Sequence, residues 1–150
     1  MKTIFDKSTR DELVQRINSL NEDNKSVWGK MNVYQMSKHC TIWNEWVLGK
    51  KDTVYKQDFL GKIFGKIALN SNTKDDKPIG KNMPAGKPFT VTETVGNLPS
   101  LKLIWTEQIN SYENFSNDEF IHDFFGKMTK EQIGIFAYKH NDHHLRQFNV

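Results

Sequence analysis

The chain has 150 residues, a length that suits one folded domain with a hydrophobic core, so we expect residues 1–150 to form a single domain. Hydrophobic residues make up 37% of it, and no apolar stretch approaches the roughly 20 residues that a membrane span needs. The single cysteine, Cys40, excludes an intrachain disulfide, and the sequence MKTIFDKSTR at the start lacks the apolar run of a signal peptide. We therefore expect a cytoplasmic protein with no membrane partner.

The net charge of +3 is unevenly distributed along the sequence. Between Lys50 and Pro88 there are nine lysines and four aspartates, scattered among Gly, Pro and Asn rather than set along one helix face. Such a segment is typical of a solvated loop, but it can also form a positive rim that attracts an anionic small molecule. We find no arginine-rich helix and no nucleic-acid recognition motif, so we expect a small-molecule substrate and no nucleic acid.

Two helices are expected in the first third of the chain. The first begins near Ser8–Thr9, where Thr9 and Glu12 match a capping box, and it ends at NEDN. The second runs from near Met31 to Gly49. The residues that recur at helical spacing are Leu13, Ile17 and Leu20 in the first helix, and Asn32, Gln35, Met36, His39, Ile42, Trp43 and Trp46 in the second. His39 therefore lies in the middle of a large apolar stripe.

A long connection is expected over about residues 50–97. It contains DFLGKIFGKIALN (58–70), which we interpret as a short helix whose apolar side covers the rest of the protein. That apolar side comprises Phe59, Leu60, Ile63, Phe64 and Ile67, with Lys62 and Lys66 on the other side. A helix on a membrane surface is the alternative, which Gly61 and Gly65 disfavour. Residues 72–88 carry loop signals, and the alternating FTVTETV (89–95) is typical of a short extended segment.

Two further helices are expected in the last third of the chain. One spans about Pro99 to Tyr112, and the other begins at Thr129, where Thr129 and Gln132 match a capping box. Their inner faces are formed by Leu101, Ile104, Trp105 and Ile109, and by Ile133, Phe136, Ala137 and His140. These elements predict an all-α four-helix bundle, with a long crossover between its second and third helices that contains the short extra helix. Bundle cores often hold metal sites.

The sequence KHNDHHLRQFNV at 139–150 contains three of the five histidines, His140, His143 and His144. If the last helix continues to about Gln147, His140 and His144 lie one turn apart, separated by only about 40° around the helix axis. They then share the apolar face of that helix, and His143 lies at its edge. Two neutral imidazoles in this arrangement can bind one divalent metal ion through one nitrogen each.

His39 is the expected third ligand, because it is the only histidine on another expected helix and lies on the buried side of that helix. Three histidines with open coordination positions suit a catalytic Zn, Ni or Fe ion. Cys40 adjoins His39 and points about 100° away from it, which disfavours a fourth, thiolate ligand. The alternative is that the histidines are hydrogen-bonded core residues. The helix dipole favours a histidine near a C-terminus, but this explains one of them and not three.

The roles of several other residues are less specific. His122 is expected to have a structural or surface role. Arg146 can pair with Asp142 at i, i+4 or hold an anionic group. Trp43 and Trp46 are interpreted as core residues rather than as a platform for substrate.

His39 combined with HNDHHLRQ near the end of the chain resembles the DinB/YfiT-like superfamily of metalloenzymes. The sequences WGKMNVYQMSKHC, FFGKMTKEQ and HNDHHLRQF are similar to a branch known only as a domain of unknown function. The resemblance covers nearly the whole chain, and many members share the pattern H-x-x-H-H-x-x-Q, here His140, His143, His144 and Gln147. It implies a DinB-like four-helix bundle in which His39, His140 and His144 bind the metal. His143 is then a neighbour that orients a ligand or water.

The resemblance also implies a range of functions. Some relatives are transferases that use low-molecular-weight thiols and others are metal-dependent hydrolases, and fold alone transfers neither activity. We expect a metal-dependent hydrolase or thiol S-transferase that activates a water or thiol nucleophile, and a homodimer formed through helix faces. The alternative is a non-catalytic bundle that binds a metal or ligand. One departure is Asp123, where members of this branch often carry Pro, so the rigidity of that loop is in question.

Overall fold

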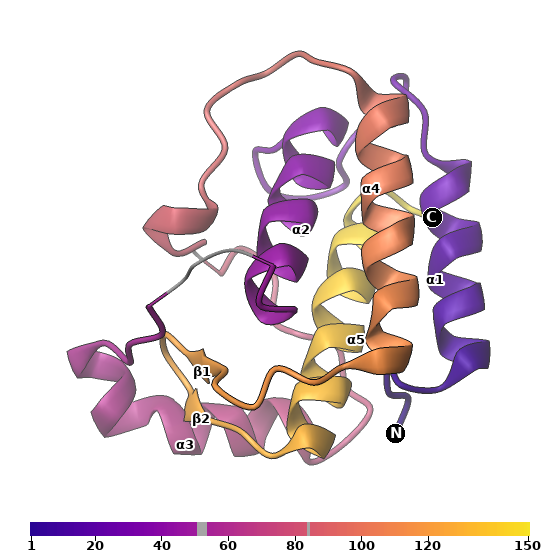
Figure 1. Cartoon of the computed structure of the whole chain (residues 1–150). Helices are drawn as coiled ribbons and strands as arrows, with labels where there is room; N and C mark the ends of the chain where they lie inside the picture. The colour runs from indigo at the N-terminus through magenta and orange to yellow at the C-terminus, as the bar shows by residue number, and fades with distance from the viewer. Residues whose placement is uncertain (51–53, 84) are drawn as a thin grey trace.

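The structure is a computed structural model, and it describes residues 1–50, 54–83 and 85–150 (Figure 1). The described residues are mostly helical, with five α-helices, two short 3-10 helices and one two-stranded antiparallel sheet. The α-helices are α1 (Lys7–Ser19), α2 (Val33–Val47), α3 (Phe59–Thr73), α4 (Leu98–Ser111) and α5 (Lys130–Gln147). The remaining elements are η1 (Lys87–Phe89), η2 (Tyr112–Asn114), β1 (Ile121–His122) and β2 (Gly126–Lys127). Across the described ranges, no helix combines the length and apolarity needed to cross a membrane.

Helices α1, α2, α4 and α5 pack side by side around one hydrophobic core, and α3 lies across one end of them (Figure 1). Helices α1 and α5 run in one direction and α2 and α4 in the other. Because α2 and α4 are neighbours that run the same way, the chain must return along the whole molecule between them. The extra helix expected in this connection is present as α3. The β1–β2 hairpin was not predicted, because strands of two residues carry no detectable alternation.

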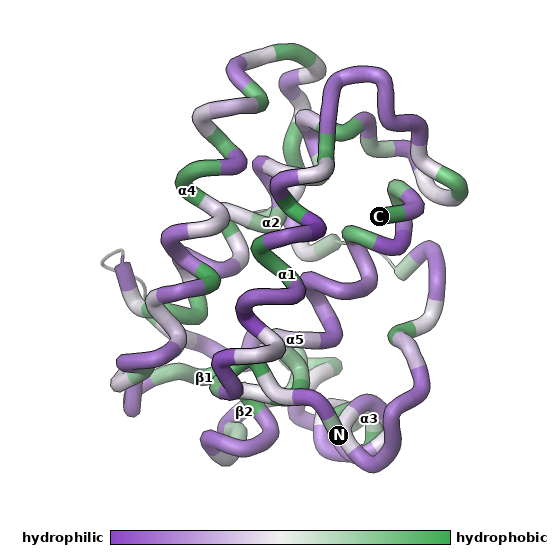
Figure 2. The backbone as a smooth tube through the Cα atoms, turned by 90° about the vertical axis from the view of Figure 1, so that its right-hand side faces the viewer, coloured by the Kyte–Doolittle hydropathy of each residue, from purple (hydrophilic) through white to green (hydrophobic). Residues whose placement is uncertain are grey.

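The inner faces of these four helices form the core. Figure 2 shows hydrophobic and hydrophilic residues alternating along α1 and α4, as a helix with one buried face requires. Within α1, α2, α4 and α5, the core residues with no exposed surface are Leu13, Ile17, Met36, Cys40, Trp105, Ile109, Ala137 and Leu145. The prediction that Ile104 belongs to the inner face of α4 is wrong, since its side chain is 45% exposed. The helix instead turns Trp105, Gln108 and Ile109 inward.

Helix α1 begins earlier than expected, and the predicted capping box of Thr9 and Glu12 is wrong. The backbone carbonyl of Asp6 accepts hydrogen bonds from the N–H groups of Thr9 and Arg10, so Thr9 lies inside the first turn and is buried. Glu12 forms an ion pair with Lys2 instead. The capping pattern therefore placed the start of α1 about one turn too late.

The two helices that carry the candidate ligands both begin with a capping box. In α5, the side chains of Thr129 and Gln132 each accept a hydrogen bond from the other's backbone N–H, as predicted. In α2, Asn32 and Gln35 form the same pair of bonds. These bonds satisfy N–H groups that otherwise lack a partner, and they define where each helix begins.

Helix α3 forms where expected but faces the opposite way, so the prediction that its apolar side covers the protein is wrong. Its buried residues are Gly61, Gly65, Leu69 and Thr73, whereas Phe59, Leu60, Ile63, Phe64 and Ile67 are 52–75% exposed. The reason is a close approach to the hairpin. A Cβ atom on Gly61 or Gly65 would lie 2.3 Å or 2.1 Å from the carbonyl oxygen of Phe124. Only the glycine side of α3 can pack there.

Candidate metal centre

Three histidines from two helices meet in the interior of the protein. The Nε2 atoms of His39 on α2 and His140 on α5 are 3.2 Å apart. With His144, one turn further along α5, they offer ligand nitrogens that all lie within 4.8 Å of one another. Within the described residues this is the only cluster of three or more His, Cys, Asp or Glu side chains placed to hold a metal ion. The three residues singled out from the sequence are thus brought together.

Two of these imidazoles have a fixed tautomer. Nδ1 of His39 lies 2.8 Å from the carbonyl oxygen of Phe89, which can only accept, so Nδ1 carries the proton and Nε2 is left with a lone pair. Nδ1 of His144 lies 3.0 Å from Oε1 of Gln147. The amide nitrogen of Gln147 donates to the carbonyl of Trp28, so the oxygen must face His144. Metal-binding histidines are typically oriented in this way.

His140 is held differently, by stacking. Its ring lies parallel to that of Trp43, with centroids 4.0 Å apart and an interplanar angle of 19°. Its Nδ1 is buried and has no hydrogen-bond partner among the described residues. Nε2 of His39 carries a lone pair, so its 3.2 Å contact requires either a proton on Nε2 of His140, which donates it to His39, or an ion that both atoms bind. In a tetrahedral zinc site with Zn–N of about 2.05 Å, ligand nitrogens are about 3.3 Å apart, close to the separation of this pair.

Burial favours the neutral form of the three imidazoles. It lowers the pKa of His39, and it holds the pKa of His144 well below the ordinary range. The pKa of His140 is also held well below its ordinary value, first by burial and then by the neighbouring imidazoles. Neutral imidazole is the form that donates a lone pair to a metal. Three neutral ligands would leave the full charge of a divalent ion in the site, which favours a strong effect on any further ligand.

The rotation of α5 about its axis is fixed beside the cluster by a buried polar network. The side-chain oxygen of Asn141 accepts hydrogen bonds from Nε1 of Trp105, at 2.7 Å, and from the amide of Asn44, at 3.0 Å. The hydroxyl of Tyr112 donates to Asn44 at 2.9 Å. These bonds link α2, α4 and α5. Because Asn141 follows His140 directly, they hold α5 in the phase that turns the two histidines toward α2.

Aromatic side chains enclose the cluster. Trp43 is 5% exposed and packs in the core as expected, but it also forms one wall of the site through its stacking on His140. Trp46 contacts Phe89, whose backbone orients His39. His39 and His144 are buried, whereas His140 retains partial exposure. The cluster is therefore largely shielded from water.

His122 is buried, which rules out the surface role and supports the structural one. Its ring lies 5.3 Å from that of Trp46 and 4.3 Å from that of Phe125. Its Nδ1 lies within hydrogen-bonding distance of the N–H of Phe124 and of the carboxylate of Asp123. Asp123 also accepts a hydrogen bond from the N–H of Phe124 through its side chain. Asp123 thus anchors this loop by hydrogen bonds, without the ring of a proline.

The remaining candidates lie beside the cluster. His143 contacts the rings of Trp28 and His144 through edges, with centroids 5.6 Å and 5.1 Å apart. The side chain that is hydrogen-bonded to His144 is instead that of Gln147. The sulfur of Cys40 lies 3.8 Å from that of Met36, and burial raises the pKa of this thiol well above its ordinary value. Cys40 is therefore an apolar core residue rather than a thiolate.

The expected contact between Arg146 and Asp142 is present, but it is long, at 3.9 Å. Asp142 pairs more closely with Arg16 of α1, at 2.8 Å. The guanidinium of Arg16 also donates to the carbonyl of Val150. Arg16 therefore holds both Asp142 and Val150 against α1, and Arg146 contributes little to binding Asp142.

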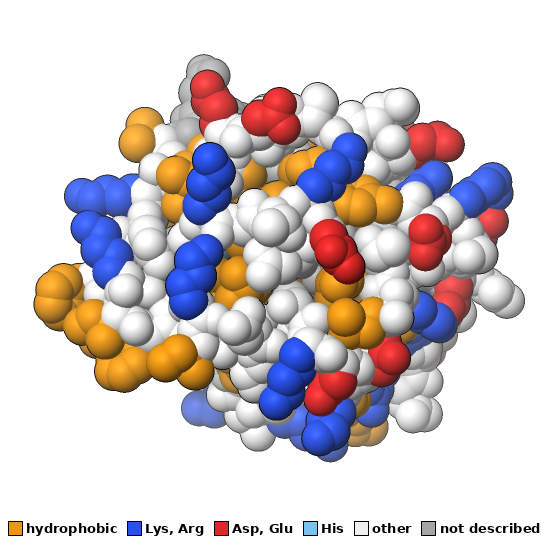
Figure 3. Space-filling model, turned by 90° about the horizontal axis from the view of Figure 1, so that it is seen from below, with side chains coloured by type: hydrophobic (Ala, Val, Ile, Leu, Met, Phe, Trp, Pro, Cys, Tyr) orange, Lys and Arg blue, Asp and Glu red, His pale blue; other side chains and the backbone are white. Residues whose placement is uncertain are grey.

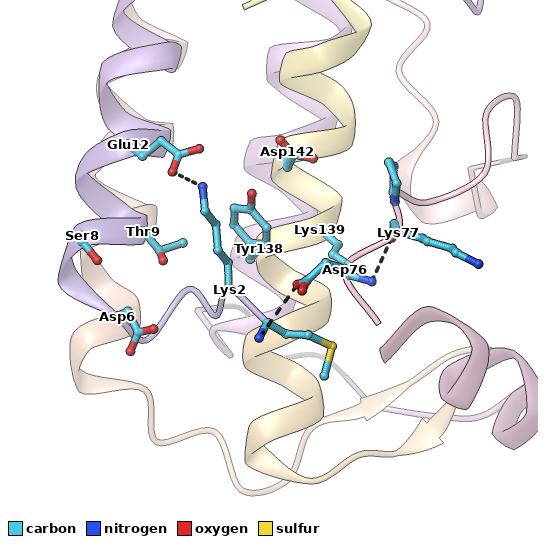
Figure 4. A pocket seen from close by; sticks show the side chains of 12 residues that line it. Lys2, Asp6, Ser8, Thr9, Glu12, Asp76, Lys77, Tyr138, Lys139 and Asp142 are labelled. Atoms are coloured by element: carbon cyan, nitrogen blue, oxygen red, sulfur yellow. Dashed lines mark hydrogen bonds and ion pairs between the residues drawn. The ribbon is translucent and has the colours of Figure 1, made fainter. Parts of the chain in front are cut away.

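A cleft of about 550 Å³ lies between the N-terminal segment, α1 and the outer side of α5, and none of the three histidines lines it (Figure 4). Two of its lysines are already engaged within the protein. Lys2 pairs with Glu12, and the amine of Lys139 donates to the backbone carbonyls of Asn72, Asp75 and Lys77.

Comparison with models of known protein families, with curated proteins and with solved structures finds no match. Function is therefore inferred from the histidine cluster and its surroundings. Helical spacing in the sequence predicted the three histidine ligands, but it could not predict that the carbonyl of Phe89 accepts a hydrogen bond from His39. Any residue type can supply a backbone carbonyl, so no sequence signal exists for it.

Proposed function

We propose that the protein is a metal-dependent enzyme with a DinB-like four-helix bundle, in which His39, His140 and His144 bind one divalent ion. The observation that carries the proposal is the meeting of three neutral imidazoles from two facing helices, two of them with Nε2 left unprotonated. Zinc, nickel and iron are the ions that such nitrogen ligands suit. The group offers three protein ligands and no carboxylate or thiolate, which is the donor set of a catalytic rather than a closed structural site.

The surrounding residues have distinct tasks in this proposal. An ion in the site would supply Lewis-acid chemistry, lowering the pKa of a bound water or thiol toward neutrality. The carbonyl of Phe89 keeps the proton of His39 on Nδ1, and the amide oxygen of Gln147 does the same for His144. Trp43 holds the ring of His140 in place by stacking. The aromatic surroundings exclude bulk water, which strengthens electrostatic interactions at the site.

The reaction class we favour is hydrolysis or thiol S-transfer, with water or a low-molecular-weight thiol as the nucleophile. An anionic small molecule is the favoured substrate. Its selection would involve Lys81, whose amine lies 4.3 Å from the ring centroid of Trp28. Trp28 contacts His143, which in turn contacts His144. This chain of contacts connects the segment between Lys50 and Pro88, which contains nine lysines, to the histidine cluster.

Elemental analysis of protein purified without a histidine tag tests the proposal. We expect about one metal ion per chain in the wild type. His39→Ala and His144→Ala should lose it, while circular dichroism shows that both variants remain helical. His143→Ala is the matched control, because His143 adjoins His144 but is not one of the three ligands, and it should retain the metal. Unchanged metal content in His39→Ala and His144→Ala would contradict the ligand set.

A non-catalytic bundle is the second candidate, and the 3.2 Å contact between His39 and His140 favours it, since a shared proton alone can stabilise that pair. The two candidates differ in whether the ion has an open position. In cobalt-substituted protein, azide or a small thiol should change the visible absorption spectrum if a position is open. A spectrum that neither molecule changes would favour a binding or structural role.

A further inference from the structure

Helix α3 presents a continuous apolar surface to solvent. We call this surface the α3 outer face, and it comprises Phe59, Leu60, Ile63, Phe64 and Ile67, each more than half exposed. Figure 3 shows hydrophobic side chains gathered at the end of the molecule where α3 lies, with Lys and Arg side chains beside them. Scattered exposed apolar residues are ordinary on protein surfaces, whereas a contiguous group of this kind usually marks an interaction surface.

Packing against the rest of the protein locks α3 in this orientation. At 100° per residue, the outer face covers an arc of about 140°, and Gly61, Gly65, Leu69 and Thr73 cover an arc of about 120° on the opposite side. The glycines touch the carbonyl of Phe124, where no side chain fits. The helix therefore cannot roll to bury its apolar residues. The two glycines also lie away from the outer face, so they do not interrupt it.

Further hydrogen bonds hold α3 at both ends. The backbone N–H of Asp58 donates to the carbonyl of Asp123 at 2.7 Å. The amine of Lys139 on α5 donates to carbonyls at and beyond the C-terminal end of α3. The amine of Lys66 donates to the carbonyl of Lys127 on β2. The outer face is thus a fixed feature of the fold rather than a disordered segment.

Helix α3 itself carries only positive charge. Between Phe59 and Thr73 the sequence contains Lys62 and Lys66 and no acidic residue, whereas Asp58 precedes the helix and Lys74, Asp75 and Asp76 follow it. A second copy packed face to face on α3 would bring these lysines together with no carboxylate on the helix to pair with them. An anionic lipid surface complements both features, because its headgroups attract the lysines and its acyl chains accept the apolar side chains.

We propose that α3 lies in the plane of an anionic lipid surface, with the outer face inserted among the lipids and the exposed Lys62 at the headgroups. Lysine side chains can extend along a helix to reach this level. This mode needs no membrane-crossing segment, so it revises the expectation of no membrane partner, which rested on the lack of an apolar stretch long enough to span. It is independent of the metal centre, and its failure would leave the proposed function untouched.

Cosedimentation with lipid vesicles tests the inference. We expect wild-type protein to bind phosphatidylcholine vesicles that contain phosphatidylglycerol, to bind pure phosphatidylcholine less, and to be released by salt. The double variant Phe59→Ser/Phe64→Ser should partition on the order of tenfold or more weakly, because two large apolar side chains no longer insert. Leu103→Ser is the matched control, since Leu103 lies on α4 and is 67% exposed. Its binding should equal that of the wild type.

Several results would overturn the inference. One is wild-type protein that stays in the supernatant with every vesicle; another is a double variant that binds as well as the wild type. Sedimentation velocity tests whether a second copy of the chain binds the outer face instead. A wild-type dimer that Phe59→Ser/Phe64→Ser converts to a monomer, with no vesicle binding by either, would assign the outer face to a second copy of the chain.

Discussion

Replacing Gly65 with alanine tests why α3 faces as it does. At an unconstrained helix position, Gly→Ala stabilises by about 1 kcal/mol, because alanine has the higher helix propensity. Here the new Cβ atom would lie 2.1 Å from the backbone carbonyl oxygen of Phe124, a neighbour that cannot rotate away. Overpacking of this kind costs about 1–3 kcal/mol or more. The clash should outweigh the propensity gain, so we expect Gly65→Ala to be destabilising, by on the order of 2 kcal/mol.

Urea unfolding followed by circular dichroism measures this effect. A loss of about 2 kcal/mol would lower the midpoint by on the order of 1 M urea. Asn70→Ala is the control, because Asn70 lies on an exposed position of the same helix and gains propensity without a clash. It should raise the midpoint slightly. A Gly65→Ala variant that is as stable as the wild type, or more stable, would refute the close packing of α3 on the hairpin.

Two further predictions concern the cluster. Gln147→Leu removes the acceptor that orients His144, so we expect the affinity for metal to fall about 10- to 100-fold. Competition with a chromophoric chelator measures this affinity, and Arg146→Gln is the control at an exposed position. An unchanged affinity in Gln147→Leu would argue against this positioning role. In the metal-free protein the folded-state pKa values of the three histidines lie below their unfolded value of about 6.5, so the unfolded chain binds more protons as the pH falls. The stability from keeping them neutral is therefore present above about pH 6.5 and is lost below it, with a slope of at most about 1.4 kcal/mol per pH unit for each histidine. Urea midpoints measured at successive pH values should show this decline, with a smaller slope in His144→Gln; a constant midpoint from about pH 7 to about pH 5 would contradict the burial of neutral imidazoles.

The parts of the site that the sequence predicted are those governed by helical periodicity. His140 and His144 are four residues apart on a helix whose start is marked by Thr129, so their common face follows from geometry alone. His39 lies within an apolar stripe, which predicted a buried position on α2. These are local properties of single helices. The three histidines meet at one point only if α2 and α5 are neighbours, which the expected four-helix bundle allowed.

The parts that the sequence did not predict depend on contacts between distant segments. Periodicity identified the apolar side of α3 but could not show which side faces the protein, since that depends on Gly65 and the carbonyl of Phe124, 59 positions later. The hydrogen bond from His39 to Phe89 joins segments 50 residues apart and involves a backbone atom. The start of α1 was misplaced because Asp6 begins the helix without a side-chain cap.

X-ray absorption spectroscopy of the protein loaded with one zinc ion tests the central claim most directly, because it reports the ligands of the ion itself. If His39, His140 and His144 hold the metal, the spectrum should show the multiple-scattering pattern of about three imidazoles, with nitrogens at about 2.0–2.1 Å, one or more lighter oxygen or exogenous ligands, and no sulfur. Sulfur at about 2.3 Å, fewer than two imidazoles, or an unchanged spectrum for His39→Ala would contradict the account.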